Sequence, residues 1–216
     1  MRKVLKIIII IIVILILLYA IFCFRNYFII KKLLEKSRNL DVSNNYKIVQ
    51  NISATTVDIL GEFYLKDNIY LYKENRTWKE DSENELDNYA IWYDSNTNEF
   101  IEFMYDDNNN LVQQEVVHKL ETLPIDTITF YKHDNFSDGN FYNILKTIIS
   151  KEGDYYKITT YFSDEKDIIY VNQDSGVIEK FSIVRSDNTT YTVTSSYEAN
   201  VVTDEMIEKP IFNISE

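Results

Sequence analysis

The chain has 216 residues and a formal net charge of −12, a length that suits one folded domain together with a short additional segment. The first 38 residues carry eight Lys or Arg and one acid, whereas the rest carry 14 basic and 33 acidic side chains, so the two parts have net charges of +7 and −19. A domain that acidic repels a phosphate backbone, which excludes nucleic acid as a partner.

The N-terminal segment is strongly apolar. Residues 7–24 form 18 consecutive uncharged positions, and roughly 17–25 such residues span a bilayer as a helix. A cleaved signal peptide has a shorter apolar region and small residues at the cleavage site, whereas Phe22 is bulky. We therefore predict a short cytoplasmic tail over residues 1–6 and an uncleaved transmembrane anchor over residues 7–24.

Basic residues flank the anchor on both sides, so the positive charges do not by themselves set its orientation. Because an anchor at the extreme N-terminus most often leads to export of the rest of the chain, we expect a single-pass protein of the cell membrane with the bulk of the chain extracytoplasmic. Cys23 is the only cysteine. The bulky Phe22 before it makes lipidation of Cys23 the less favoured alternative.

Residues 25–38 have the pattern of an amphipathic stem helix. Tyr27, Ile30, Leu33 and Leu34 recur at helical spacing, and basic residues occupy the other positions. Such a helix either packs against the domain or lies among the lipid headgroups. We favour packing.

From residue 45 onward the apolar residues alternate, which is typical of strands, and Asn- and Asp-rich turns separate them. Short connections join antiparallel neighbours, so we expect a meander within a β-rich domain over residues 39–216. The predicted strands are 46–53, 56–65, 69–74, 89–94, 99–106, 111–119, 155–162, 167–172, 177–185 and 191–202.

One helix interrupts the strands. Residues 140–151 place their apolar side chains at helical spacing. Residues 122–138, around Pro124, are predicted to form a loop. The helix should bury Phe141, Ile144, Leu145, Ile148 and Ile149.

Several strands are apolar on both sides. In residues 99–106, Phe100 and Met104 point one way while Ile101, Phe103 and Tyr105 point the other, and residues 89–94 repeat this pattern. A sheet with one solvated face would alternate polar and apolar residues more cleanly. We therefore expect both faces to be covered, one by helices and the other by curling of the sheet or by a ligand.

Two segments carry a resemblance to a known family. Residues 167–180, Asp-Ile-Ile-Tyr-Val-Asn-Gln-Asp-Ser-Gly-Val-Ile-Glu-Lys, resemble a hairpin of the LolA-like superfamily, with Asn172 in place of the family's Asp. Residues 197–210, Tyr-Glu-Ala-Asn-Val-Val-Thr-Asp-Glu-Met-Ile-Glu-Lys-Pro, are similar to the ending of small anchored proteins of spore-forming Gram-positive bacteria, some of them germination lipoproteins. By order of elements, the resemblance extends over residues 30–212.

This resemblance implies a mostly antiparallel α+β fold, in which a curved half-barrel meander with one or two covering helices comes after the transmembrane helix. It also implies a carrier of lipid or lipoprotein, or a relative of such carriers that binds a protein partner. Fold by itself does not decide between these functions.

No residue set indicates catalysis. His118 and His133 are the only histidines and have no cysteine beside them, and there is no phosphate-binding glycine loop. The segment starting at Asp94 begins like a calcium loop but has Glu99 where glycine is needed and Tyr105 where a glutamate is needed. We expect no enzyme, no metal and no cofactor.

The expected function is a membrane-anchored extracytoplasmic binding domain that holds a lipid or acyl group in a hydrophobic cavity. The alternative is an anchored protein-interaction or regulatory module at the cell surface, for example in sporulation or germination. Large apolar side chains are the candidates for the cavity lining, and ordinary core packing is the competing interpretation for all of them. These candidates are Phe63, Leu65, Leu71, Trp78, Trp92, Phe103 and Met104.

Overall fold

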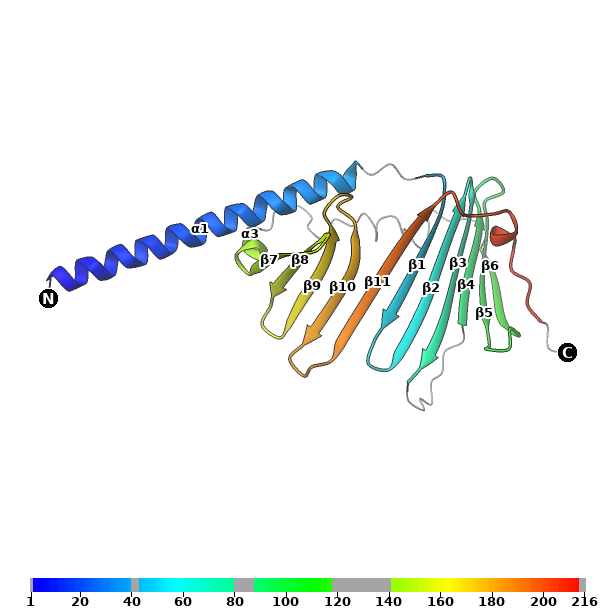
Figure 1. Ribbon diagram of the computed structural model, residues 1–216. Coiled ribbons are helices and arrows are strands. Elements are labelled where there is room, and N and C mark those ends of the chain that lie inside the picture. Colours follow the sequence, from blue (N-terminus) through cyan, green and yellow to red (C-terminus); the bar gives the residue numbers. More distant parts are fainter. Residues whose placement is uncertain (1, 40–42, 80–87, 118–140, 214–216) are drawn as a thin grey trace.

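The computed structural model describes residues 2–39, 43–79, 88–117 and 141–213. A long helix, α1 (Arg2–Arg38), precedes an eleven-stranded sheet, with a short helix, α3 (Phe141–Leu145), and a single 3-10 turn, η2 (Glu205–Ile207) (Figure 1). The strands are β1 (Asn45–Ser53), β2 (Val57–Lys66), β3 (Ile69–Trp78), β4 (Asn88–Asp94), β5 (Glu99–Tyr105), β6 (Leu111–Val117), β7 (Thr147–Glu152), β8 (Tyr155–Tyr161), β9 (Glu165–Asn172), β10 (Ile178–Arg185) and β11 (Thr190–Ala199).

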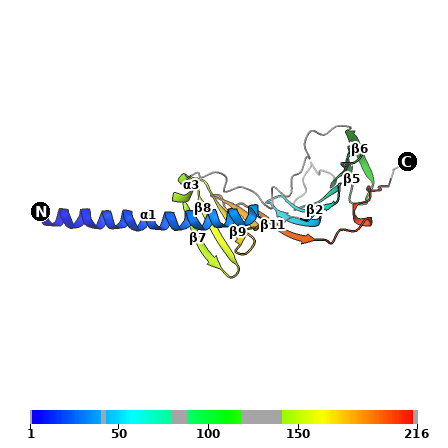
Figure 2. The ribbon, with the colours of Figure 1, turned by 90° about the horizontal axis from the view of Figure 1, so that it is seen from above.

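The sheet is open and its strands are antiparallel neighbours in the order β6-β5-β4-β3-β2-β1-β11-β10-β9-β8-β7. The chain builds one half outward from β1 to β6, restarts at the opposite edge with β7 and returns inward to β11. The first and last strands therefore meet in the middle, where Tyr46 lies opposite Ala199. Seen from above, the sheet is bent (Figure 2). The predicted α+β class and antiparallel meander are confirmed.

All ten predicted strands are present. The largest differences are at β3, which continues four residues further to Trp78, and at β11, which ends at Ala199 instead of residue 202. Residues 118 and 119 of one predicted strand and the predicted loop at 122–138 lie outside the described residues.

The predicted helix over residues 140–151 is wrong in its second half. Helix α3 ends at Leu145, and residues from Thr147 form strand β7 at the edge of the sheet. Ile149 is buried whereas Ile148 is exposed, which is the alternation of a strand. Gly153, at a φ of +59°, forms the tight turn into β8. Ile148 and Ile149 follow Ile144 and Leu145 at helical spacing, which is why the sequence pattern predicts a helix although these two residues belong to a strand.

The two faces of the sheet are defined by the strand register. One face, here the helix face, carries Ile149, Ile158, Ile169 and Phe181 at its β7–β10 end, where α1 packs. The same face continues through β11, β1, β2 and β3 as a cluster made only of sheet residues, namely Tyr46, Ile48, Phe63, Leu65, Tyr70, Tyr72 and Tyr197.

The opposite face, here the tail face, carries Tyr64, Leu71, Trp92 and Ile101 in one row across β2–β5. The C-terminal segment, residues 200–213, packs on this row through Val202, Ile207 and Phe212. On β4 and β5 the apolar tail-face side chains are buried, whereas on the helix face Ile91 and Phe100 are buried and the other side chains are half-buried. The sequence predicts helices on one face and curling of the sheet or a ligand on the other. Helix α1 covers its face only at β7–β10, and a mostly extended segment packs on the tail face. Such a segment has no periodicity that would have revealed it.

Helix α1 runs without a break through residue 24, where the anchor was expected to end and the stem to begin. From Lys3 to Ser37 it is long and apolar enough to cross a membrane. The large apolar side chains of its N-terminal half, from Val4 to Leu18, are 47–60% exposed. An exposed surface this apolar is stable in lipid and unfavourable in water.

The C-terminal half of α1 packs on the sheet. Its buried residues are Cys23, Asn26, Leu33 and Ser37, spaced at three, seven and four positions along one side of the helix. Tyr27, which had been expected on this side, is exposed. The Asn26 amide donates a hydrogen bond to the carbonyl of Thr147 at 2.8 Å. The stem therefore packs against the domain, which was the favoured alternative.

The turn between β9 and β10 contacts the backbone of α1. Asn172 accepts hydrogen bonds through its side chain from the N–H groups of Asp174, at 3.0 Å, and Ser175, at 3.2 Å. Gly176 comes next in the turn, at a φ of +73°, and a Cβ atom there would lie 2.3 Å from the carbonyl oxygen of Leu33. The hairpin that resembles the LolA-like family is thus one of the points where the sheet contacts the helix, and any side chain at position 176 would clash with the helix backbone.

Candidate ligand-binding pocket under the C-terminal segment

A pocket of about 360 Å³ lies between the tail face and the C-terminal segment. Pockets that bind small molecules usually measure roughly 300–1,000 Å³, so this pocket is at the small end of that range. Its lining residues are Glu62, Lys73, Asn75, Ala90, Tyr105, Asn109, Pro210, Ile211 and Phe212.

The strand register forms the floor of the pocket. Glu62 on β2, Lys73 on β3 and Ala90 on β4 lie opposite one another in a single row across the sheet. Ala90 is fully buried between larger neighbours. Its small side chain leaves the space that a larger residue would fill.

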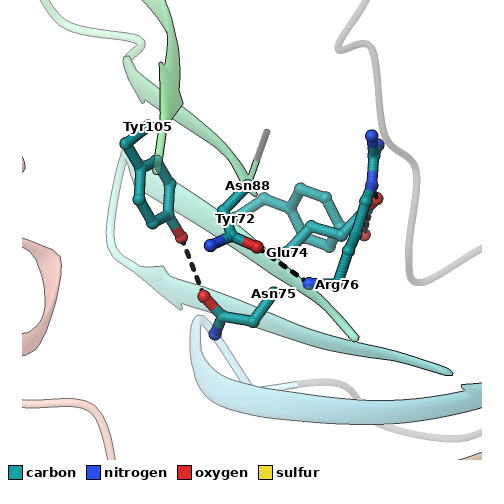
Figure 3. Close-up of polar contacts among 6 residues, drawn as sticks. All are labelled: Tyr72, Glu74, Asn75, Arg76, Asn88 and Tyr105. Atoms are coloured by element: carbon teal, nitrogen blue, oxygen red, sulfur yellow. Dashed lines mark hydrogen bonds and ion pairs between the residues drawn. The ribbon is translucent and has the colours of Figure 1, made fainter. Parts of the chain in front are cut away.

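Polar side chains line the neighbouring part of the floor. The Tyr105 hydroxyl donates a hydrogen bond to the Asn75 Oδ1 at 3.1 Å (Figure 3). Asn88 links β4 to β3, because its Oδ1 accepts a hydrogen bond from the backbone N–H of Arg76 at 2.8 Å (Figure 3). These contacts hold β3, β4 and β5 in fixed relative positions beneath the pocket.

The opposite wall is the C-terminal segment, which is fixed at several points. The Trp92 indole N–H donates to the carbonyl of Ile207 at 3.0 Å, and Lys66 forms an ion pair with Asp204. The Phe212 ring packs with its centroid 4.8 Å from that of Tyr105. Asn213 then pairs in parallel with the chain beside β6. These contacts hold the C-terminal segment in a defined position on the sheet.

The pocket contains two charged side chains, and within the described part of the chain only one of them, Glu62, forms a direct ion pair. Glu62 accepts a hydrogen bond from the Lys47 Nζ at 2.7 Å. Burial raises the pKa of the Glu62 carboxyl, but hydrogen bonds from Lys47 and Tyr64, together with the charges of Lys47 and Lys73, outweigh this and hold the pKa below its usual value. Among the described residues Lys73 forms no ion pair. The charge of Lys73 acts on Glu62, which lies opposite it across β2 and β3, without a direct ion pair between the two side chains.

Tyr105 keeps its proton at neutral pH. Burial, together with the negative charges of Glu62 and Glu74, raises the pKa of its hydroxyl to about 12. The hydroxyl is thus a hydrogen-bond donor to Asn75 and not a base. The pocket can bind and orient a molecule.

The Lys47–Glu62 pair predicts an acid-dependent loss of stability. Because the folded-state pKa of Glu62 is below its unfolded value, its contribution is present above the unfolded pKa and is lost as the pH falls through the folded one. Glu62→Gln should lower the free energy of unfolding by about 1 kcal/mol at neutral pH and leave it nearly unchanged in strong acid. Denaturant titrations across this pH range measure the difference. An equal loss at every pH would contradict it.

The seven predicted lining residues lie on two faces. Leu71, Trp92 and Phe103 are on the tail face, in the cluster that also contains Ala90, Tyr105 and Phe212 from the pocket lining. The other four, on the helix face, are Phe63, Leu65, Trp78 and Met104. They do not surround one cavity, and none of the seven lines the 360 Å³ pocket.

Sequence reasoning missed Lys73, Glu62 and the wall at residues 210–212. The predicted lining residues are all large apolar side chains, so Lys73 and Glu62 were not among them. Their opposition across β2 and β3 could have been found from the hairpin register, but the C-terminal wall requires the tertiary structure. Among the described residues no group of three His, Cys, Asp or Glu could hold a metal ion, and both histidines lie outside those residues.

No family model and no curated protein matches the chain. Among solved structures it is similar to PNGF-II in two crystal forms, at 12% and 13% identity and a TM-score of 0.30, covering 80% of this chain and 31% of the other. It is also similar to the hypothetical protein CT021 from Chlamydia trachomatis, at 10% identity and a TM-score of 0.31, covering 83% and 98%. The chain spans about a third of the length of PNGF-II. Likeness at this level carries no argument, and the LolA-like resemblance stays a prediction.

Proposed function

We propose that this protein is a membrane-anchored, extracytoplasmic binding domain that holds an acyl group with an anionic head in the pocket under the C-terminal segment. The observation that carries the proposal is the lining, in which Lys73 borders the same cavity as Ala90 and Phe212. The exposed apolar half of α1 supports the anchor. The bent sheet with a helix across one end supports a half-barrel of the LolA-like kind (Figure 2).

The pocket chemistry suits an amphiphile. A carboxylate or phosphate would pair with Lys73, and a charge-assisted hydrogen bond of this kind contributes about 1.5–3 kcal/mol. The adjacent Glu62 does not oppose such a head strongly, because Lys47 pairs with it at 2.7 Å. The apolar part of the ligand would lie against Ala90 and Phe212.

A photoreactive dodecanoate tests the proposal on the full chain in lipid nanodiscs. We expect labelling at Ala90, Tyr105 and residues 210–212 that unlabelled dodecanoate competes away. Lys73→Met should reduce this labelling about tenfold, the equivalent of about 1.4 kcal/mol. Lys151→Met, at an exposed lysine on β7, is the matched control and should change nothing. Labelling confined to α1, or equal labelling of both variants, would reject an acyl ligand in this pocket.

The runner-up is an anchored protein-interaction module. Its supporting observations are the charge of −19 after residue 38 and the two terminal strands of the open sheet, β6 and β7, which offer edges for strand pairing. A partner held by charge should be recovered from the cell surface at low salt and lost at high salt. Recovery of such a partner together with unsaturable dodecanoate labelling would favour this second function.

A further inference from the structure

The end of the sheet beside α3 lies next to the part of α1 that would cross the membrane. The Tyr19 hydroxyl donates a hydrogen bond to the carbonyl of Leu145, the last residue of α3. Cys23, one turn further along α1, is buried. Both residues belong to the apolar run over residues 7–24. The folded domain thus begins before the apolar run ends.

The length of the helix places this contact at the membrane boundary. At a rise of about 1.5 Å per residue, the 18 residues of the apolar run extend about 27 Å, close to the roughly 30 Å thickness of the hydrocarbon core. The 12 residues that precede Tyr19 extend only about 18 Å. A bilayer that stopped at Tyr19 would therefore be far too thin, so the lipid must reach the level of α3.

Exposed apolar side chains gather at this end of the domain. Leu145 is 38% exposed and Ile148 51%, and at the end of β8 Tyr161 is 47% exposed and Phe162 38%. The two groups are neighbours, because the Tyr161 N–H donates to the carbonyl of Lys146 at 3.1 Å. Figure 1 shows α3 and the turn between β8 and β9 at the end of the sheet nearest the apolar half of α1.

We infer that Leu145, Ile148, Tyr161 and Phe162 form a second membrane contact, inserted into the interfacial layer of the bilayer beside α1. Amphipathic surfaces of this kind bury their apolar side about 5–10 Å into the boundary between headgroups and acyl chains, and aromatic residues favour this level. The contact rests on the membrane anchor proposed above and does not depend on the pocket.

The contact is apolar in character. The turn after Phe162 also carries Asp164 and Glu165, both exposed, and these would be repelled by anionic headgroups. A zwitterionic phosphatidylcholine surface avoids that repulsion. The consequence of the contact is geometric, because an anchor helix together with a second insertion point fixes the tilt of the sheet on the membrane, whereas a single helix would leave the domain free to rock.

Spin-label accessibility tests the contact on the full chain in phosphatidylcholine nanodiscs, in a Cys23→Ser background. Labels at Phe162→Cys and Ile148→Cys should show several-fold greater accessibility to oxygen, relative to a water-soluble nickel reagent, than a label at Val112→Cys. Val112 is 56% exposed on β6, at the other end of the sheet, and serves as the aqueous control. Ile14→Cys, in the middle of the apolar run, is the control for membrane depth.

The outcomes separate the two claims. If the Ile14 label is deep while the Phe162 and Ile148 labels match the Val112 label, the second contact is overturned and the anchor stands. If the Ile14 label also matches the Val112 label, the anchor itself fails and the contact fails with it. Loss of dodecanoate labelling in the pocket would affect neither result.

Discussion

Gly176→Ala is expected to lower the free energy of unfolding by about 2–5 kcal/mol. An L-residue in the left-handed conformation costs about 1–2 kcal/mol, and Gly176 has a φ of +73°. The added methyl would also overlap the Leu33 carbonyl oxygen, at 2.3 Å, and the Ser37 amide nitrogen, at 2.7 Å. Forced overlap of this kind costs about 1–3 kcal/mol. Thermal melts in one detergent should show a midpoint about 4–20 °C lower.

The chain contains a matched control for this change. Gly153 also has a positive φ, +59°, but a Cβ atom there would meet nothing within 4 Å. Gly153→Ala should therefore show only the conformational cost of about 1–2 kcal/mol. Hydrogen exchange adds a local readout, since Gly176→Ala should accelerate exchange over the C-terminal half of α1 and Gly153→Ala should not. Equal effects of the two variants would mean that the β9–β10 turn does not hold the helix.

Phe103→Ala is expected to cost about 3–5 kcal/mol even without a ligand, as truncation of a fully packed aromatic residue does. Phe103 is 2% exposed, and its ring centroid lies 5.0 Å from that of Phe212. If Phe103 instead lined an open hydrophobic cavity, truncation would remove few packing contacts and would change stability little until ligand was added. Denaturant unfolding of the unliganded protein separates the two interpretations.

Val112→Ala controls for general effects of truncating an apolar residue in the sheet. Val112 is on β6 and largely exposed, so its truncation should change stability by no more than about 0.5 kcal/mol. A Phe103→Ala variant as stable as Val112→Ala would support the cavity interpretation for this residue. A large loss would place Phe103 with the core, as its burial under the C-terminal segment indicates.

Local patterns in the sequence determined most of the secondary structure. Apolar runs and alternation between turns predicted ten of the eleven strands, and Asn and Asp marked their turns because these residues tolerate left-handed backbone, as Asn98, Asn109 and Asn188 do here at φ values of 55–67°. The apolar N-terminal run indicated a long helix. Alternation in β4 and β5 also showed that both faces must be buried, because side chains of a strand point alternately to opposite sides.

The segments that cover those faces were decided only by tertiary structure. The C-terminal segment is mostly extended, and its Ile207 carbonyl and Phe212 ring meet Trp92 and Phe103, more than a hundred positions earlier in the chain. The restart of the chain at β7, which brings β11 beside β1, likewise leaves no local signal. Periodicity reports which side of a strand is apolar, whereas the identity of the covering segment depends on long-range contacts between residues far apart in the chain. For that reason the predicted cavity residues were divided between two faces, and the pocket around Lys73 emerged only from the fold.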